Sequence, residues 1–337
     1  MLELISKNQI IAIIGMAKNV GKTTTLNYLL EKLQNQETVG LTSVGRDGES
    51  RDLVFDTPKP KIYVSKGAII ATSTSSLKLS DFTKQILETT GMNTSMGEVV
   101  IVRALSAGFV DLAGPTYNEQ MDVVINLMKK HGCKKILIDG AVGRKAIASI
   151  DNCDGVILCT GAAYSSNIKT VVDNTEHMVN ILTLNQVTDN IAFNKLLSSA
   201  KVTYIYQDNS FKQLKLKTIL SAGRKIAAKL TRTVSYLLLD GALTAEFIKA
   251  LQVERDKIGK LTIVVKHPTN CLYNQEYRNI LERLNVDIKV IKPVNLLCLT
   301  LNPTSPYGYH FDEGTFLARL RKKVSQPLYN VKRDHNE

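Results

Sequence analysis

The first strong pattern in the chain is a buried strand followed by a helix with one apolar face. Residues 10–15 read IIAIIG, an almost purely apolar run that is typical of a strand buried on both faces of a parallel sheet. A short loop follows, and the next residues carry leucines at helical spacing, at Leu26, Leu29, Leu30 and Leu33. The pattern therefore predicts a strand, a loop and a helix within the first 33 residues.

Strand-like and helix-like patterns keep alternating as far as residue 184. Apolar runs predict strands at 39–44, 99–102, 109–112, 136–140 and 155–160, and shorter apolar runs lie at 62–64 and 68–71. Helical spacing and capping residues predict helices at 80–90, 117–131 and 167–184. Residues 49–66 carry two prolines and no helical period, so we expect a long loop there. The order of elements predicts an α/β fold with a mostly parallel, doubly wound sheet.

The alternation resumes beyond residue 187 in a stretch that is richer in lysine. Strands are predicted at 202–206, 236–239, 262–265, 288–291 and 296–301. Helices are predicted at 214–230, 244–252, 274–284 and 313–324. We therefore expect two α/β domains, residues 1–186 and residues 187–337, which suits a chain of 337 residues.

Composition is typical of a globular protein that is not exported. Hydrophobic residues make up 44% of the chain, and no uninterrupted apolar run is long enough to span a bilayer, so no membrane partner is expected. The first residues, MLELISKNQ, lack the basic start and the small-residue cleavage site of a signal peptide. The five cysteines are an odd number and form no CxxC pair, which is typical of reduced thiols. A cytoplasmic protein is therefore expected.

Positive charge is concentrated in the C-terminal part of the chain. Lys and Arg outnumber Asp and Glu by 23 to 12 in residues 201–337, but only by 20 to 19 in residues 1–200. Such an excess favours an acidic protein partner, a phosphorylated ligand or nucleic acid. No nucleic-acid-binding motif and no cluster of base-stacking aromatic residues accompanies it, and a solvated face explains most of these lysines. Nucleic acid is therefore the weaker interpretation, and residues 187–337 are expected to be a basic domain that contacts a partner or substrate.

The loop after the first strand ends in a GKT sequence, Gly21, Lys22 and Thr23, which indicates phosphate binding. Unpaired backbone N–H groups at the start of a helix point toward an anion, and a glycine lets the backbone approach it. A lysine adds positive charge for the outer phosphates, and a threonine hydroxyl can bind Mg²⁺. The residues expected to bind the nucleotide are Gly15, Lys18, Asn19, Val20, Gly21, Lys22, Thr23 and Thr24.

One position departs from the Walker A pattern of P-loop NTPases. That pattern has a glycine five residues before Gly21, but Met16 stands there and the nearest glycine is Gly15. Either the loop is one residue longer, or Met16 takes the glycine's place with ordinary backbone angles. An ordinary strand-to-helix turn with a chance GKT is the alternative, but the apolar strand and the amphipathic helix on either side favour phosphate binding.

Acidic residues follow two other predicted strands, where they would reach the same edge of the sheet as the loop. Asp139 ends the run ILID and is the candidate Walker B acid, which would act on phosphate through Mg²⁺. Asp47 follows another strand, where an acid can bind Mg²⁺ or position water. Asp139 could instead satisfy the N–H groups of a turn, and Asp47 could lie in a solvated turn. The expected catalytic residues are Lys22, Asp139 and Asp47, and the expected Mg²⁺ ligands are Thr23, Asp47 and Asp139.

Two further sequences bear on the choice of ligand. Asn194 and Lys195 begin an NKxD-like sequence, but Leu197 replaces the aspartate that reads guanine, so ATP is preferred over GTP. Residues 302–310 read NPTSPYGYH after a predicted strand. Their two prolines favour a rigid turn, and a ligand or partner loop of the second domain is the alternative.

Several motifs, taken in order, resemble one narrower family. They are GMAKNVGKTTTLN, GLTSVGRDGE, GFVDLAGP, and ILIDGAVGRKAIAS followed by VILCTGA, within about the first 165 residues, with LNPTSPYGYHFD near the end. Together they resemble P-loop proteins encoded with B12-dependent lysine or ornithine aminomutases, which are proposed subunits of a reactivating factor. The phosphate-binding part alone is also similar to dethiobiotin synthetase and the molybdopterin-guanine dinucleotide accessory protein.

The resemblance implies an ATP-driven role in replacing damaged cobalamin in an aminomutase, with a second reactivase subunit as partner. Lys22 and Thr23 would then bind phosphate and Mg²⁺, and Asp47 and Asp139 would be their acidic partners. The chain has no DxHxxG signature of base-off cobalamin binding, so cobalamin is expected to contact the mutase. A small-molecule kinase or ligase of the dethiobiotin-synthetase type and a nucleotide-dependent scaffold are the alternative functions.

Overall fold

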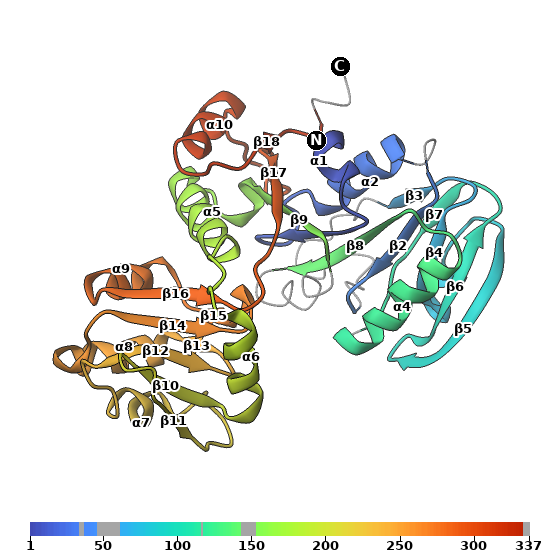
Figure 1. Ribbon diagram of the computed structural model, residues 1–337. Helices are drawn as coiled ribbons and strands as arrows, with labels where there is room; N and C mark the ends of the chain where they lie inside the picture. Colours follow the sequence, from blue (N-terminus) through green and yellow to red (C-terminus); the bar gives the residue numbers. More distant parts are fainter. Residues whose placement is uncertain (34–36, 46–60, 116, 143–152, 333–337) are drawn as a thin grey trace. The chain divides into compact units, whose positions relative to one another are not determined.

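The computed structural model describes residues 1–33, 37–45, 61–115, 117–142 and 153–332. The chain forms two compact units: Met1–Val172 and Leu296–Glu337 make up unit 1, and Asp173–Asn295 makes up unit 2. Each unit has its own sheet with accompanying helices (Figure 1). This division differs from the single boundary expected after residue 186, because the C-terminal residues return to unit 1.

In unit 1, nine strands of the described chain form one sheet in the order β18-β17-β9-β1-β8-β2-β4-β6-β5. Neighbours from β18 to β4 are parallel, whereas β6 runs antiparallel to both β4 and β5. The prediction of a mixed α/β fold with a mostly parallel sheet is therefore confirmed. The strands are β1 (Ile10–Gly15), β2 (Val39–Ser43), β4 (Ile69–Ser73), β5 (Lys84–Thr94), β6 (Gly97–Ala104), β8 (Lys135–Val142), β9 (Gly155–Gly161), β17 (Leu296–Asn302) and β18 (Leu328–Tyr329), and a separate antiparallel ribbon pairs β3 (Ile62–Val64) with β7 (Gly108–Val110).

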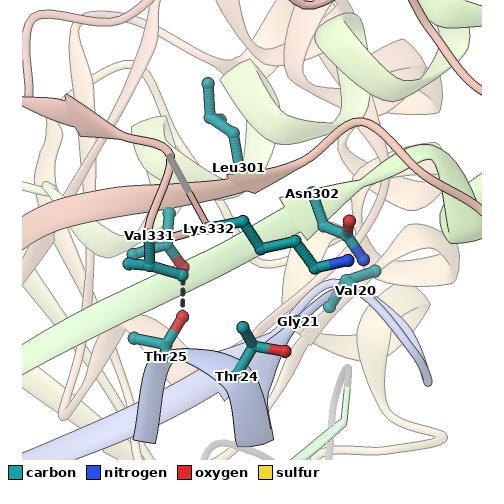
Figure 2. Close-up of a pocket in the computed structure, with 9 residues that line it drawn as sticks. Val20, Gly21, Thr24, Thr25, Leu301, Asn302, Val331 and Lys332 are labelled. Atoms are coloured by element: carbon teal, nitrogen blue, oxygen red, sulfur yellow. Dashed lines mark hydrogen bonds between the residues drawn. The ribbon is translucent and has the colours of Figure 1, made fainter. Parts of the chain in front are cut away.

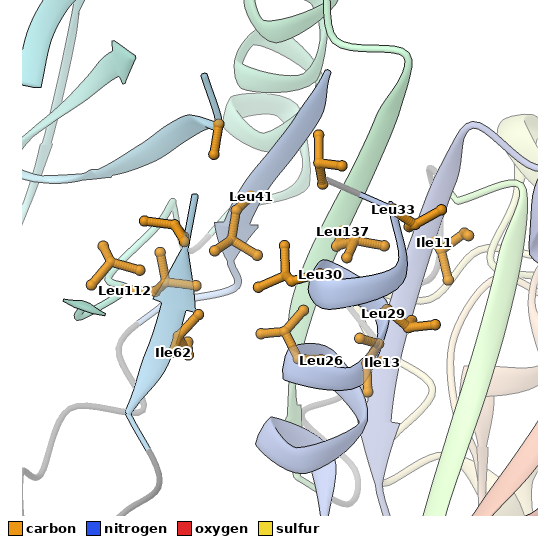
Figure 3. Close-up of a cluster of buried hydrophobic side chains, with 14 of the residues drawn as sticks. Ile11, Ile13, Leu26, Leu29, Leu30, Leu33, Leu41, Ile62, Leu112 and Leu137 are labelled. Carbon is orange, nitrogen blue, oxygen red and sulfur yellow. The ribbon is translucent and has the colours of Figure 1, made fainter. Parts of the chain in front are cut away.

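Helices of unit 1 lie on both faces of this sheet. Helix α2 (Lys22–Leu33) packs its predicted leucine face on one side (Figure 3), in a core that includes Ile11, Ile13, Leu26, Leu29, Leu30, Leu41 and Leu137. Helix α4 (Asn118–Lys130) lies on the other side, because its Met128 contacts Gly40, the residue before Leu41. The other described helices of unit 1 are α1 (Leu2–Ser6), α3 (Thr74–Lys78), the start of α5 (Ile168–Leu182), a 3-10 turn at Ala162–Tyr164, and α10 (Glu313–Arg321).

The strand predicted at 296–301 belongs to unit 1 and not to a second domain. As β17, it pairs in parallel with β9 on one side and with β18 on the other. All but its last residue are buried, as expected for a strand inside a parallel sheet. Residues 302–310, for which a loop of the second domain was the alternative to a rigid turn, therefore begin at the last residue of a strand of unit 1.

The helix predicted at 80–90 is wrong, because most of these residues form strand β5. This strand pairs antiparallel with β6 and places Ile86 opposite Val102. Gly91, the residue after the predicted helix, has a φ of 70° and lies where the pairing register shifts, as in a bulge. The apolar strand β6 offers a long partner, and this tertiary pairing outweighs a short local helical pattern.

Lys135 ties the N-terminal helix α1 to β8. Its side chain is buried, and its ammonium donates hydrogen bonds to the backbone carbonyls of Ile5, Ser6 and Asn8 at 2.8, 2.6 and 2.6 Å. Lys135→Met keeps the apolar stem but removes three charge-assisted hydrogen bonds. We expect it to lower the free energy of unfolding by about 3 kcal/mol, measured by urea denaturation.

The matched control for this variant is Lys134→Met, at the neighbouring, exposed lysine. It should change the free energy of unfolding by less than about 0.5 kcal/mol. Equal effects of the two substitutions would contradict the structural role assigned to Lys135.

In unit 2, five strands of the described chain form a second sheet in the order β11-β10-β12-β14-β16. Strands β12, β14 and β16 are parallel, whereas β10 runs antiparallel to β11 and β12. The helix predicted at 214–230 is wrong, because only α7 within it is helical and residue 214 ends strand β11. Besides the end of α5, the elements are α6 (Asn190–Ser199), β10 (Val202–Tyr206), β11 (Phe211–Leu214), α7 (Gly223–Ala227), β12 (Val234–Leu239), β13 (Leu243–Thr244), α8 (Ala245–Val253), β14 (Leu261–Val265), β15 (Cys271–Leu272), α9 (Gln275–Arg283) and β16 (Val286–Val290), with 3-10 turns at Arg255–Lys257 and Pro268–Asn270.

We expect a buried histidine to make unit 2 sensitive to acid. His177 donates a hydrogen bond from Nε2 to the carbonyl of Tyr273 at 2.9 Å, and its buried Nδ1 has no hydrogen-bond partner in the described chain. Burial lowers the pKa of His177 and Arg278 lowers it further, although the bond to Tyr273 opposes them. Protonation of His177 therefore occurs more readily in the unfolded chain. The contribution of the neutral His177 to the free energy of unfolding is fully present above about pH 6.5, and it declines as the pH falls below that value.

His177→Gln is expected to reduce this loss of stability in acid. The substitution can keep a donor for the Tyr273 carbonyl while removing the group that titrates. Urea midpoints measured at pH 8 and pH 5 should differ less in the variant than in the wild type. An unchanged difference between the two midpoints would assign the acid sensitivity to other groups.

Candidate functional site

A tight loop, residues 16–21, connects the central strand β1 to helix α2. Asn19 and Gly21 adopt the left-handed region, with φ values of 60° and 99°. Met16 is not among the residues with positive φ, so it takes ordinary backbone angles. This is one of the two alternatives that the sequence left open. The amide of Thr25 donates to the carbonyl of Gly21 at 2.9 Å and closes the first turn of α2. The helix therefore starts directly from the loop, with its first N–H groups at the carboxyl end of β1.

The side chain of Lys22 folds back over the end of β1. A Cβ added to Gly15 would lie 3.0 Å from both Cγ and Cδ of Lys22 and 2.9 Å from Cγ2 of Val20. Gly15 is therefore required for the close approach of the loop to the strand. Lys22 is only 8% exposed, and it forms no hydrogen bond or ion pair with any residue that the structure describes. A lysine in this position can form charge-assisted hydrogen bonds with an anion that enters the loop.

Asp139 lies on β8, the strand beside β1. It is in register with Ile13, whose side chain packs beneath α2, so the carboxylate is on the same face of the sheet as that helix. Burial raises the pKa of the Cys159 thiol, the positive charge of Lys22 lowers it, and the negative charge of Asp139 raises it. The charges of Lys22 and Asp139 therefore both act on one thiol of β9, from α2 and from β8.

Asn302, at the end of β17, holds the loop from the other side. Its amide donates a hydrogen bond from Nδ2 to the carbonyl of Asn19 at 3.2 Å. A Cβ on Gly21 would lie 3.3 Å from the Cβ of Asn302, so the two segments are in close contact. The side-chain nitrogen of Asn19 is buried and has no hydrogen-bond partner in the described part of the chain. After the ammonium of Lys22, this nitrogen is the second donor at the loop that has no acceptor in the described chain.

A small buried polar network lies beneath the first turn of α2. The hydroxyls of Thr25 and Thr300 are 2.9 Å apart, and the Thr300 hydroxyl donates to Sγ of Cys159 at 3.1 Å. Thr25 and Cys159 are themselves 3.6 Å apart between Oγ1 and Sγ. These contacts join α2, β9 and β17, so they hold the loop between fixed elements.

A pocket opens beside this loop, between the first turn of α2 and the C-terminal residues (Figure 2). It is narrow and partly open, with a cavity volume of about 10 Å³, which is room for about one water molecule. Its walls are Val20, Gly21, Thr24, Thr25, Thr300, Leu301, Asn302, Val331 and Lys332. The sequence analysis identified Asn302 only as part of a loop. Nothing in the sequence around Lys332 indicates that it lines a pocket.

The remaining predicted residues are distributed around the loop or lie outside the description. Thr23 and Thr24 are half-buried in the first turn of α2, and Lys18 is exposed. Asp47 lies outside the described residues. Asn194 and Lys195 are within helix α6 of unit 2, so they do not follow a strand as an NKxD sequence would.

No family model matches the chain, and no curated protein matches it. Among the residues that the structure describes, no three His, Cys, Asp or Glu side chains gather into a group that could bind a metal ion. Within the same ranges, no helix combines the length and the apolar character needed to cross a lipid bilayer.

Proposed function

We propose that this chain is a P-loop NTPase, which binds the phosphates of a nucleoside triphosphate with loop 16–21 and the start of α2. The observation that carries the proposal is Lys22: a lysine that is 8% exposed, at a helix N-terminus, without a hydrogen bond or ion pair in the described chain. A phosphate supplies the missing anion, and the backbone N–H groups of the first turn supply further donors.

The surrounding residues fit a triphosphate better than a single small anion. The buried Nδ2 of Asn19 needs an acceptor, and the missing side chain of Gly15 is what allows Lys22 to lie over the loop. Asp139 and the Thr23 hydroxyl would hold Mg²⁺, which when bound offsets negative charge on the phosphates. Mg²⁺ keeps waters and phosphate oxygens among its ligands, so a site with few protein carboxylates suits it.

Each residue then has a distinct role in phosphoryl transfer. Lys22 fixes the outer phosphates and stabilises the charge that accumulates on them. The buried contacts beneath α2 and the Asn302 hydrogen bond keep the loop in one shape, so little reorganisation is needed when the nucleotide arrives. ATP is the proposed nucleotide, as the sequence favours it over GTP.

The proposed biological role is ATP-dependent reactivation of an adenosylcobalamin-dependent lysine or ornithine aminomutase, together with a second reactivase subunit. Its support is the order of motifs in the sequence. In unit 2, the segment from Phe211 to Arg232 is consistent with a docking surface for such a partner, because it contains seven Lys and Arg residues and no acid. Its exposed lysines are Lys212, Lys215, Lys217, Lys225 and Lys229.

Two measurements on the full-length chain test these proposals. Titration calorimetry with ATP, GTP and Mg²⁺ should give tight binding of Mg-ATP, and an absence of binding to either nucleotide would reject the P-loop proposal. ATP turnover should be slow and should rise when an aminomutase with damaged cobalamin is added. Turnover that rises only with a small metabolite would favour a kinase or ligase, and binding without any turnover would favour a scaffold.

A further inference from the structure

The outermost strand of the unit 1 sheet, β5, pairs with β6 on one side and has no neighbouring strand on the other side in the described chain (Figure 1). It is 11 residues long and contains no proline. Just before it, the carbonyl of Thr83 accepts a hydrogen bond from the amide of Leu105 at 2.7 Å. Because the direction of the backbone groups alternates along an antiparallel ladder, those of Lys84 and Ile86 point away from β6. This edge therefore offers donors and acceptors to another strand.

The two charged side chains of β5 are both engaged within their own chain. The ammonium of Lys84 donates to the carbonyl of Leu77 at 2.6 Å. The carboxylate of Glu88 lies 2.8 Å from Nε2 of His131 and 3.2 Å from Nζ of Lys130. Charged side chains on an edge strand commonly keep other strands away, but these two are directed to partners on neighbouring elements. The edge therefore presents little repulsion to a second strand.

Exposed aliphatic side chains surround the first half of β5. The exposed fraction is 62% for Ile86, 69% for Leu79 and 43% for Leu105. Leu79 directly follows α3, and Leu105 directly follows β6, opposite the start of β5. Exposed apolar side chains that gather at one place are typical of a surface that contacts another protein.

The other edges of the two large sheets are protected in the described chain. Strand β18, at the opposite edge of the unit 1 sheet, has two residues. In unit 2, β11 has four residues, of which Lys212 is exposed, and exposed lysines follow it. The edge of β16 is covered, because the amide of Val290 donates to the carbonyl of Asn185 at 3.0 Å. Of these four edges, β5 alone combines length, low charge and exposed apolar side chains.

We propose that β5 pairs with β5 of a second copy of this chain, antiparallel around Ile86, so that two unit 1 sheets join. A two-fold axis at this residue brings identical edges together, and the outward backbone groups of each copy meet those of the other. Lysines such as those of β11 would repel one another in such a contact, whereas the charges of β5 are already paired. The pairing register of β5 shifts after Ile86, which limits the joined length. We therefore expect a reversible dimer.

Sedimentation velocity of the full-length protein without nucleotide, at about 1 to 100 µM, tests this pairing. The wild type should change from monomer to dimer within this range. Ile86→Lys adds a charge to the edge, and Ile86→Pro removes an outward N–H group but none that faces β6. Each should weaken dimerisation at least about tenfold. Because Ile86 is exposed, urea denaturation should show that both variants fold.

The matched control is Ile191→Lys, at an 84% exposed isoleucine of α6, which should dimerise like the wild type. A wild type that stays monomeric over the whole range would overturn the proposal. A dimer that persists in both Ile86 variants would also overturn it, because the interface would then lie elsewhere. Equal weakening in Ile191→Lys would do the same, because it would indicate a general effect of charge.

The dimer proposal stands apart from the proposed P-loop function. Four strands, β8, β2, β4 and β6, separate β5 from β1 in the sheet, so Ile86→Lys should bind Mg-ATP like the wild type. A monomeric wild type that binds Mg-ATP would reject the dimer alone, and a dimer that binds no nucleotide would reject the P-loop proposal alone.

Discussion

Lys22→Met is expected to weaken Mg-ATP binding by about 100-fold, because each charge-assisted hydrogen bond to phosphate contributes about 1.5–3 kcal/mol and the lysine would make more than one. Methionine keeps an apolar stem of similar length over Gly15, so the shape of the loop is retained. Titration calorimetry measures the loss. The matched control is Lys32→Met, at the other end of the same helix, which should bind Mg-ATP like the wild type.

The same variant gives a second, independent result on stability. The side chain of Lys22 forms no hydrogen bond or ion pair in the described chain, so the unliganded protein loses no such contact when the ammonium is removed. Lys22→Met should therefore leave the free energy of unfolding unchanged or raise it by about 1 kcal/mol. A loss of several kcal/mol without any loss of binding would identify Lys22 as a structural residue and contradict the proposed function.

Asp139→Asn is expected to lower ATP turnover by on the order of 100-fold while weakening Mg-ATP binding only a few-fold. The amide has the shape of the carboxylate but not its charge, so it holds Mg²⁺ poorly against the phosphates. Single-turnover measurements at saturating nucleotide separate this effect from binding.

The control for Asp139 lies at the opposite end of the same sheet. Asp154 accepts hydrogen bonds at Oδ2 from the amides of Gln9 and Ile10, at 3.0 and 2.8 Å, beside the start of β1. Asp154→Asn should leave turnover unchanged, because this acid lies a full strand length from loop 16–21. Wild-type turnover in Asp139→Asn would assign Asp139 to a purely structural role.

The elements around the candidate site were predictable because their signals are local. The strand predicted at 10–15 is β1, and the predicted leucine face of the following helix is the face that α2 buries. A short run of isoleucines is typical of a strand buried on both faces of a sheet, and leucines three and four residues apart line one side of a helix. These patterns reflect which side chains are buried and which face solvent. They do not depend on which strand or helix lies next to them.

Strand partners were not predictable, because an apolar run reports burial without specifying its neighbour. Strand β17 was recognised from its residues but assigned to the wrong unit, although β9, its partner in the sheet, was also recognised. Strand β5 was taken for a helix, because its half-buried pattern is weak and only the pairing with β6 decides it. Both differences come from contacts between residues far apart in the sequence.

Gly15, Gly21, Lys22 and Thr23, with their spacing between a strand and a helix, could be read from the sequence alone. The surroundings of this loop depend on the tertiary structure, which places Asp139 on the α2 face and brings Asn302 and Lys332 beside the loop. The two differ in how far apart along the chain the contacting residues lie. Backbone geometry is set within a few residues, whereas a pocket wall is set by which strands pair, and β17 and β18 join the sheet from the far end of the chain.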